Sequence, residues 1–116
     1  MAEVFSRAFL EPDKYEPNTW VNLYDLEEVN LTGAMVFDFS ISNTSKINIT
    51  IEVRLVDAEN KIVHYILGPT ELQGQGISWD SSHKIVMMPG DMLQVKASEK
   101  GISFYASIVT NLKMPA

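Results

Sequence analysis

The side chains that could support metal binding or acid–base catalysis are few in this sequence of 116 residues. The two histidines are His64 and His83, and the acid nearest to either is Asp80, three residues before His83. An Asp-x-x-His pair could supply two ligands to one metal ion. A zinc site uses three or four ligands, however, and the sequence identifies no third. We therefore expect no metal site.

Nucleophilic chemistry has equally little support in the sequence. A serine nucleophile would need a histidine base and an orienting acid, and no Gly-x-Ser-x-Gly elbow is present. The absence of cysteine excludes thiol nucleophiles, thiolate metal sites and disulfides. We expect a protein that is not an enzyme, with no catalytic residue and no cofactor.

Aromatic side chains leave a binding function open. Trp20 and Trp79 are possible ligand contacts, and Tyr24 and Tyr105 could join them, because exposed aromatic rings stack on sugars. Sandwich folds also serve as lectin scaffolds. The same tryptophans stand at a strand start and before a loop, where burial is just as ordinary. A carbohydrate-binding or receptor-binding module therefore stays an alternative.

Composition and charge narrow the partners further. The net charge of −6 disfavours nucleic acid, since affinity for phosphate backbones depends on Lys and Arg. The uncharged apolar runs are far shorter than the roughly 20 residues of a membrane helix, so we expect no membrane partner. The length and a hydrophobic content of 46% suit one folded domain with a single core.

An apolar period of two residues predicts the elements that position these side chains. In Ile47–Leu55 every odd residue is aliphatic and every even one polar, which predicts a strand with one buried face. In Leu31–Ile41 the odd residues, including Gly33, Met35 and Phe37, are expected to face the core. The other expected strands cover 18–26, 61–67, 83–88, 93–98 and 102–109.

The connections between these segments have the composition of tight turns. Pro89-Gly90-Asp91 combines a fixed φ with a glycine, and Gly101 ends a second hairpin loop with a positive φ. Seven to eight short strands with turns at these intervals predict an all-β fold, an antiparallel β-sandwich or jelly roll.

Residues 1–17 differ from the rest and are expected to form an extended N-terminal arm before a sandwich domain at 18–116. Pro12 and Pro17 disfavour a helix there. Four large apolar residues in the arm are expected to contact a partner: Phe5, Phe9, Leu10 and Tyr15.

Four segments between Trp20 and Leu112 carry a characteristic succession of residue types. They are Ser42–Ser45, Ile49–Val53, Tyr65–Pro69 and, longest, Lys84–Ser98 with the sequence KIVMMPGDMLQVKAS. This succession resembles a group of small bacteriophage virion proteins with a β-sandwich fold. It covers about four-fifths of the chain. The departures are the arm and the Met88-Pro89 pair.

The resemblance implies a structural protein of the virion, made in the host cytoplasm, with no catalytic residues to transfer. Capsid decoration or stabilisation is the leading expectation, and a tail or neck component is the alternative within the same class. Its partners would be the major capsid or the tail and neck subunits, and further copies of itself in a homo-oligomer.

Overall fold

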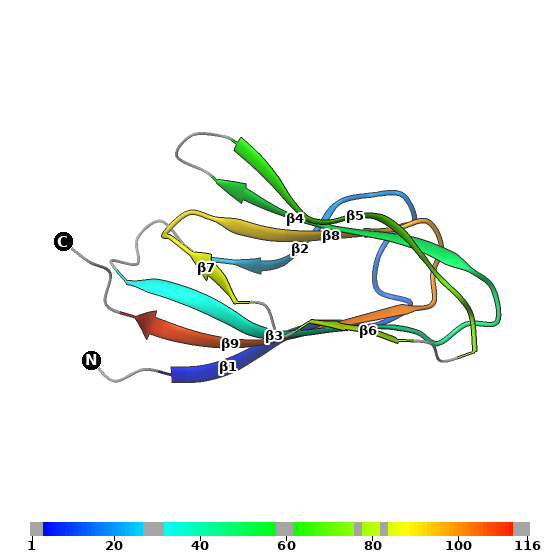
Figure 1. The fold of residues 1–116 in the computed structure, drawn as a ribbon, viewed down its shortest axis with the longest axis horizontal. Coiled ribbons are helices and arrows are strands. Elements are labelled where there is room, and N and C mark those ends of the chain that lie inside the picture. Colours follow the sequence, from blue (N-terminus) through cyan, green and yellow to red (C-terminus); the bar gives the residue numbers. More distant parts are fainter. Residues whose placement is uncertain (1–3, 27–31, 58–61, 76–77, 82–83, 113–116) are drawn as a thin grey trace.

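The protein is an antiparallel β-sandwich of two sheets. The computed structural model describes residues 4–26, 32–57, 62–75, 78–81 and 84–112, which contain nine strands and no helix. The first sheet has the order β1 (Val4–Leu10), β9 (Ile102–Leu112), β3 (Gly33–Asn43), β6 (Ser78–Ser81), and β7 (Ile85–Met87) also pairs with β3. The second has the order β2 (Val21–Asp25), β8 (Met92–Ala97), β4 (Ile49–Asp57), β5 (Ile62–Leu72). Figure 1 shows the sheets as two stacked layers.

The core lies between the layers and follows the predicted alternation in the central strands. In β4 the side chains of Ile49, Ile51 and Val53 are fully buried, as are Leu93 and Val95 in the neighbouring β8. These strands were expected from their period of two, and the structure confirms them. Ile47 was expected in the same buried row, but its side chain is 52% exposed because the strand begins at Ile49.

The predicted inner face of β3 is wrong in its first half because the strand contains a β-bulge. The register against β9 shifts between Val36 and Asp38, so Phe37 is the extra residue. An extra residue inverts the alternation, since side-chain direction has a period of two. The buried aliphatic and aromatic side chains are Ala34 and Val36 before the bulge and Phe39 and Ile41 after it.

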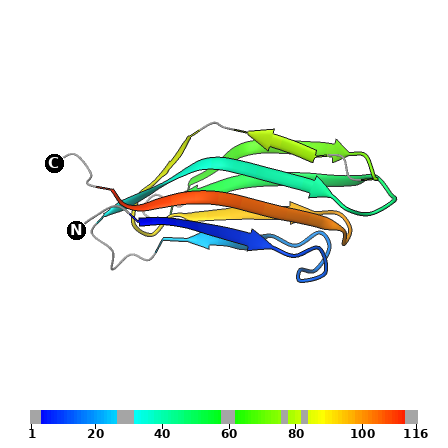
Figure 2. The same ribbon diagram turned by 90° about the horizontal axis from the view of Figure 1, so that it is seen from below.

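The structure places residues 4–10 of the expected arm inside the sandwich. Strand β1 pairs with β9 over its whole length, from Val4 opposite Thr110 to Leu10 opposite Phe104. It is an edge strand of the first sheet, and Figure 2 shows β9 between it and β3. This strand accounts for part of the difference between the nine strands observed and the seven to eight expected.

Tyr15 connects the loop after β1 to the β8–β9 turn and to the start of β9. Its side chain is buried, its ring packs edge-on against Phe104, and its hydroxyl donates a hydrogen bond to the Glu99 carbonyl (2.5 Å). The same hydroxyl accepts one from the Ile102 backbone N–H (3.2 Å). Burial raises the pKa of this phenol above its ordinary value.

The two predicted glycine turns are present. Gly90 and Gly101 both have positive φ, at 94° and 125°. In the first turn the buried Asp91 carboxylate accepts a hydrogen bond from the Met88 N–H (2.9 Å). The Gly90 N–H donates to the Leu26 carbonyl (2.6 Å), which ties this turn to the end of β2.

Candidate functional site

The outer face of the first sheet carries an apolar row across four strands. Phe5 on β1 is paired with Val109 on β9, Val109 with Met35 on β3, and Met35 with Val86 on β7. At the ends of the row, Phe5 is 73% exposed and Val86 is 55% exposed. Their outward direction follows from the buried side chains next to them in sequence, such as Ile85 and Ile108.

The bulge in β3 adds a second aromatic ring to this row. Phe37 meets Phe5 edge-to-face, with ring centroids 6.1 Å apart, although β9 lies between their strands. Val109, directly opposite Phe5 on that intervening strand, is only 4% exposed. The two rings and Val109 therefore form a packed apolar surface on the outside of the sandwich.

A row of charges follows next along the same face. Arg7 on β1 is paired with Ser107 on β9, and Ser107 with Asp38 on β3. Both charged side chains are exposed, and the Arg7 guanidinium lies 5.8 Å from the centroid of the Phe9 ring. Within the described part of the chain neither forms an ion pair.

The third row is again partly aromatic. Phe9 on β1 is paired with Tyr105 on β9, and Tyr105 with Ser40 on β3. Phe9 is 57% exposed and Tyr105 is also exposed. We call these three rows together the outer face of the first sheet. Contiguous exposed apolar side chains of this kind mark interaction surfaces on soluble proteins.

The four arm residues expected to contact a partner occupy different environments. Phe5 and Phe9 lie on this outer face. Leu10 packs against the core from the other side of β1, and Tyr15 is buried in the core. Sequence reasoning missed Met35 and Phe37 as surface residues, because nothing in the alternation of β3 signals a bulge. It assigned no face to Val86, which lies on the short strand β7.

The outer face of the second sheet is built around Trp20. The Arg54 guanidinium lies over this ring, 3.9 Å from its centroid, and Lys96 Nζ lies 5.0 Å away. Tyr65 meets the ring edge-to-face at 6.2 Å. Arg54 Nε donates a hydrogen bond to Gln94 Oε1 (2.7 Å), which holds the guanidinium over the ring. The face is therefore an ordered cation–π cluster.

The structure does not bring the two tryptophans into one site. Trp20 belongs to the outer face of the second sheet, where cations already contact its ring. Trp79 on β6 is paired with Ile41, packs against the core and meets Phe39 edge-to-face at 6.3 Å. Tyr24 is partly buried, and burial raises its pKa.

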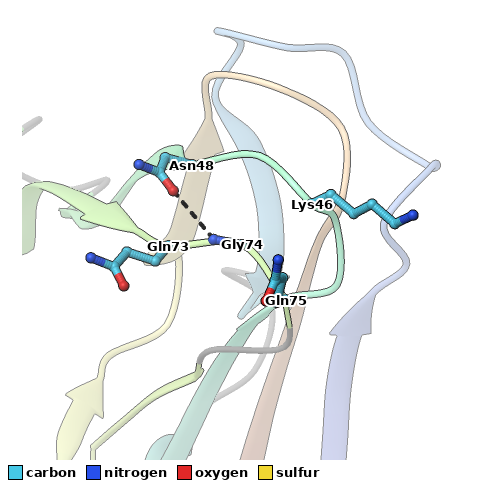
Figure 3. Close-up of a pocket in the computed structure, with 5 residues that line it drawn as sticks. All are labelled: Lys46, Asn48, Gln73, Gly74 and Gln75. Carbon is cyan, nitrogen blue, oxygen red and sulfur yellow. Dashed lines mark hydrogen bonds between the residues drawn. The ribbon is translucent and has the colours of Figure 1, made fainter.

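A polar pocket of about 390 Å³ lies where the β3–β4 loop meets the segment after β5. Its lining residues are Lys46, Asn48, Gln73, Gly74 and Gln75, shown in Figure 3. The Gly74 N–H donates to Asn48 Oδ1 (3.4 Å), while the side chains of Lys46 and Gln73 extend away from each other. Their polar groups do not converge on one point where a ligand atom could bind.

The histidines form no metal site in the described residues. His64 is exposed on β5 opposite Leu55, and His83 lies outside the described residues. Asp80 is exposed on β6. Across the ranges that the structure describes, no group of three potential metal-ligating residues comes together.

No helix in these ranges is long and apolar enough to cross a membrane. No family model matches the sequence, and a search of curated proteins finds no significant match.

Proposed function

We propose that the protein is a non-enzymatic structural subunit of a bacteriophage virion that decorates or stabilises the capsid. The contact surface in this proposal is the outer face of the first sheet. The observation that carries the choice of this surface is the pair of exposed aromatic residues on β1, Phe5 and Phe9. They share one face with Val86, Met35 and Phe37.

Burial of these side chains would supply the binding free energy. A fully buried aromatic or aliphatic side chain of this size contributes about 1.5 to 3 kcal/mol relative to exposure. Phe5 and Phe9 are already held on a paired strand, so little conformational entropy remains to be lost on binding. Interfaces also draw much of their affinity from a few aromatic anchors of this kind.

The assignment to a virion rests on the resemblance of Lys84–Ser98 and its preceding segments to phage sandwich proteins. A particle presents its binding sites in many symmetric copies, so a modest contact by a small subunit is multiplied through avidity.

The test is incorporation into particles of a phage that carries this coding sequence. Purified virions are analysed by mass spectrometry for the wild-type chain and for a Phe5→Ser/Phe9→Ser variant. The matched control, Ile47→Ser/Val63→Ser, removes two exposed aliphatic side chains elsewhere on the surface. We expect the wild type and the control in the particles and the aromatic variant to be depleted from them.

Two outcomes would contradict the proposal. One is the absence of the wild-type chain from purified virions. The other is equal incorporation of a folded Phe5→Ser/Phe9→Ser variant, which would remove the outer face of the first sheet from the contact. Binding of the isolated chain to a glycan array would instead support the carbohydrate-binding alternative. Immunogold labelling of the particles separates capsid from neck or tail positions.

A further inference from the structure

We infer that the outer face of the first sheet binds the same face of a second copy of this chain, in a dimer whose twofold axis runs parallel to β9. The inference rests on the proposed function and makes the partner of this face in the virion a second subunit of the same kind, rather than another capsid protein. It is carried by the arrangement of opposite charges between two apolar rows.

The charges lie symmetrically about β9. Arg7 and Asp38 stand in the same row on the two strands that flank β9, with Ser107 between them. Adjacent strands are about 4.8 Å apart, so the two charged residues are about 10 Å apart across the sheet. A face with one positive and one negative side is complementary to its own copy only in certain orientations.

A face-to-face dimer can have its twofold axis along the strands or across them. An axis across the strands would place Arg7 over Arg7 of the second copy and Asp38 over Asp38, which is repulsive. An axis along β9 exchanges the two sides, so each Arg7 lies over an Asp38. Packed sheets are about 10 Å apart, a gap that an arginine side chain reaches across. Charge therefore selects the axis parallel to β9.

The same axis also matches the apolar rows. It places Phe5 over Met35 of the second copy and Phe9 over Ser40, while Val109 and Tyr105 on β9 meet their own counterparts. The row of Phe5, Val109 and Met35 thus meets an apolar row, the charged row meets the charged row, and the partly aromatic row of Phe9 and Tyr105 meets its own copy. Sheets that pack face to face keep their strands within about 30° of each other, which this orientation allows.

The size of the face indicates a weak dimer. The axis along β9 superposes three strands, β1, β9 and β3, on the second copy; at about 4.8 Å a strand and about 3.4 Å for each of the seven residues of β1, the footprint is about 340 Å². A standard stable interface removes about 800 Å² of accessible surface from each partner, so this face is at the small end. We expect self-association that depends strongly on concentration.

Charge-reversal variants of the full chain test this dimer, with the dissociation constant measured by sedimentation equilibrium. Arg7→Asp and Asp38→Arg should each raise the dimer dissociation constant by about tenfold or more, because each creates two like-charge contacts. An equimolar mixture of the two variants should form a heterodimer with wild-type affinity, since every contact is again a pair of opposite charges. Lys100→Asp, an equal charge change in the exposed β8–β9 turn, should leave dimerisation unchanged.

Recovery in the mixture also shows that both variants are folded. The inference is overturned if the wild type stays monomeric up to its solubility limit, if the single variants dimerise as the wild type does, or if the mixture does not recover. A monomeric wild type that is still incorporated into virions through Phe5 and Phe9 would overturn the dimer and leave the proposed function standing. A wild type that dimerises as expected but is absent from purified virions would overturn the proposed function and leave the dimer standing.

Discussion

The hydroxyl of Tyr15 offers the sharpest test of how the loop after β1 is held. Tyr15→Phe removes one oxygen and keeps the buried ring against Phe104. The lost hydroxyl accepts a hydrogen bond from the Ile102 N–H, at a buried position where water cannot replace it. It also donates to the Glu99 carbonyl, which belongs to an exposed residue and can be solvated. The loss of stability on substitution therefore comes mainly from the Ile102 N–H, which is left without an acceptor.

A buried donor left without a partner costs about 1 to 3 kcal/mol, so we expect Tyr15→Phe to lower the free energy of unfolding by about 2 kcal/mol. Unfolding entropies near 2.1 cal/mol/K per residue give about 0.24 kcal/mol/K for a chain of this length, so Tm should fall by about 8 °C. Differential scanning calorimetry measures both quantities.

Tyr24→Phe is the matched control. The Tyr24 hydroxyl has no hydrogen-bond partner among the described residues, so its loss should change Tm by no more than about 2 °C. Equal and small effects of the two substitutions would refute the role given to the Tyr15 hydroxyl.

The alkaline pH dependence of stability gives a second readout of the same residue. Burial raises the pKa of Tyr15 above 10.0, so above pH 10 the unfolded chain loses this proton before the folded one does. The part of the free energy of unfolding that comes from this raised pKa is fully present below pH 10. It is lost as the pH rises through the pKa of Tyr15 in the folded state. Urea unfolding should show this loss in the wild type and a smaller one in Tyr15→Phe. Burial, and then Asp25, also raises the pKa of Tyr24, so part of the dependence should persist.

Two further predictions concern the loops at the polar pocket. Gly74→Ala should lower the free energy of unfolding by about 1 to 3 kcal/mol, because a Cβ there would lie 2.5 Å from the Lys46 carbonyl carbon. Gly68→Ala, which meets nothing within 4 Å, should be neutral, and equal Tm values for the two variants would contradict the packing argument. Asn43→Asp should cost about 3 kcal/mol or more in urea unfolding, since the buried amide donates to the Ile47 and Leu72 carbonyls at 2.8 and 3.0 Å. A carboxylate cannot donate these bonds, and wild-type stability of this variant would mean that they are not important.

The β-sandwich could be predicted from the sequence because its central strands satisfy local rules. The alternation of Ile49, Ile51 and Val53 exposes one apolar face whatever the partner strand is. The turns at Gly90 and Gly101 need a positive φ that glycine supplies without strain. Both signals belong to single short segments, so they can be recognised before any tertiary contact is known.

The candidate interaction surface could be predicted only in part. Phe5 and Phe9 stand out as apolar residues with no place in the expected core. Tyr15 has the same composition signal but is buried, because the loop after β1 folds back onto β9. Phe37 was assigned to the core by an alternation that a single extra residue reverses.

The sequence by itself determined the all-β class and the central strands and turns, since these follow from residue types and periods within one segment. Only the tertiary structure decided that Val4–Leu10 completes the first sheet and that Arg7 and Asp38 share one row on either side of β9. These facts depend on register between strands about a hundred and about seventy residues apart. No tight turn joins these strands, so their register is fixed by how their apolar faces fit into the assembled sandwich.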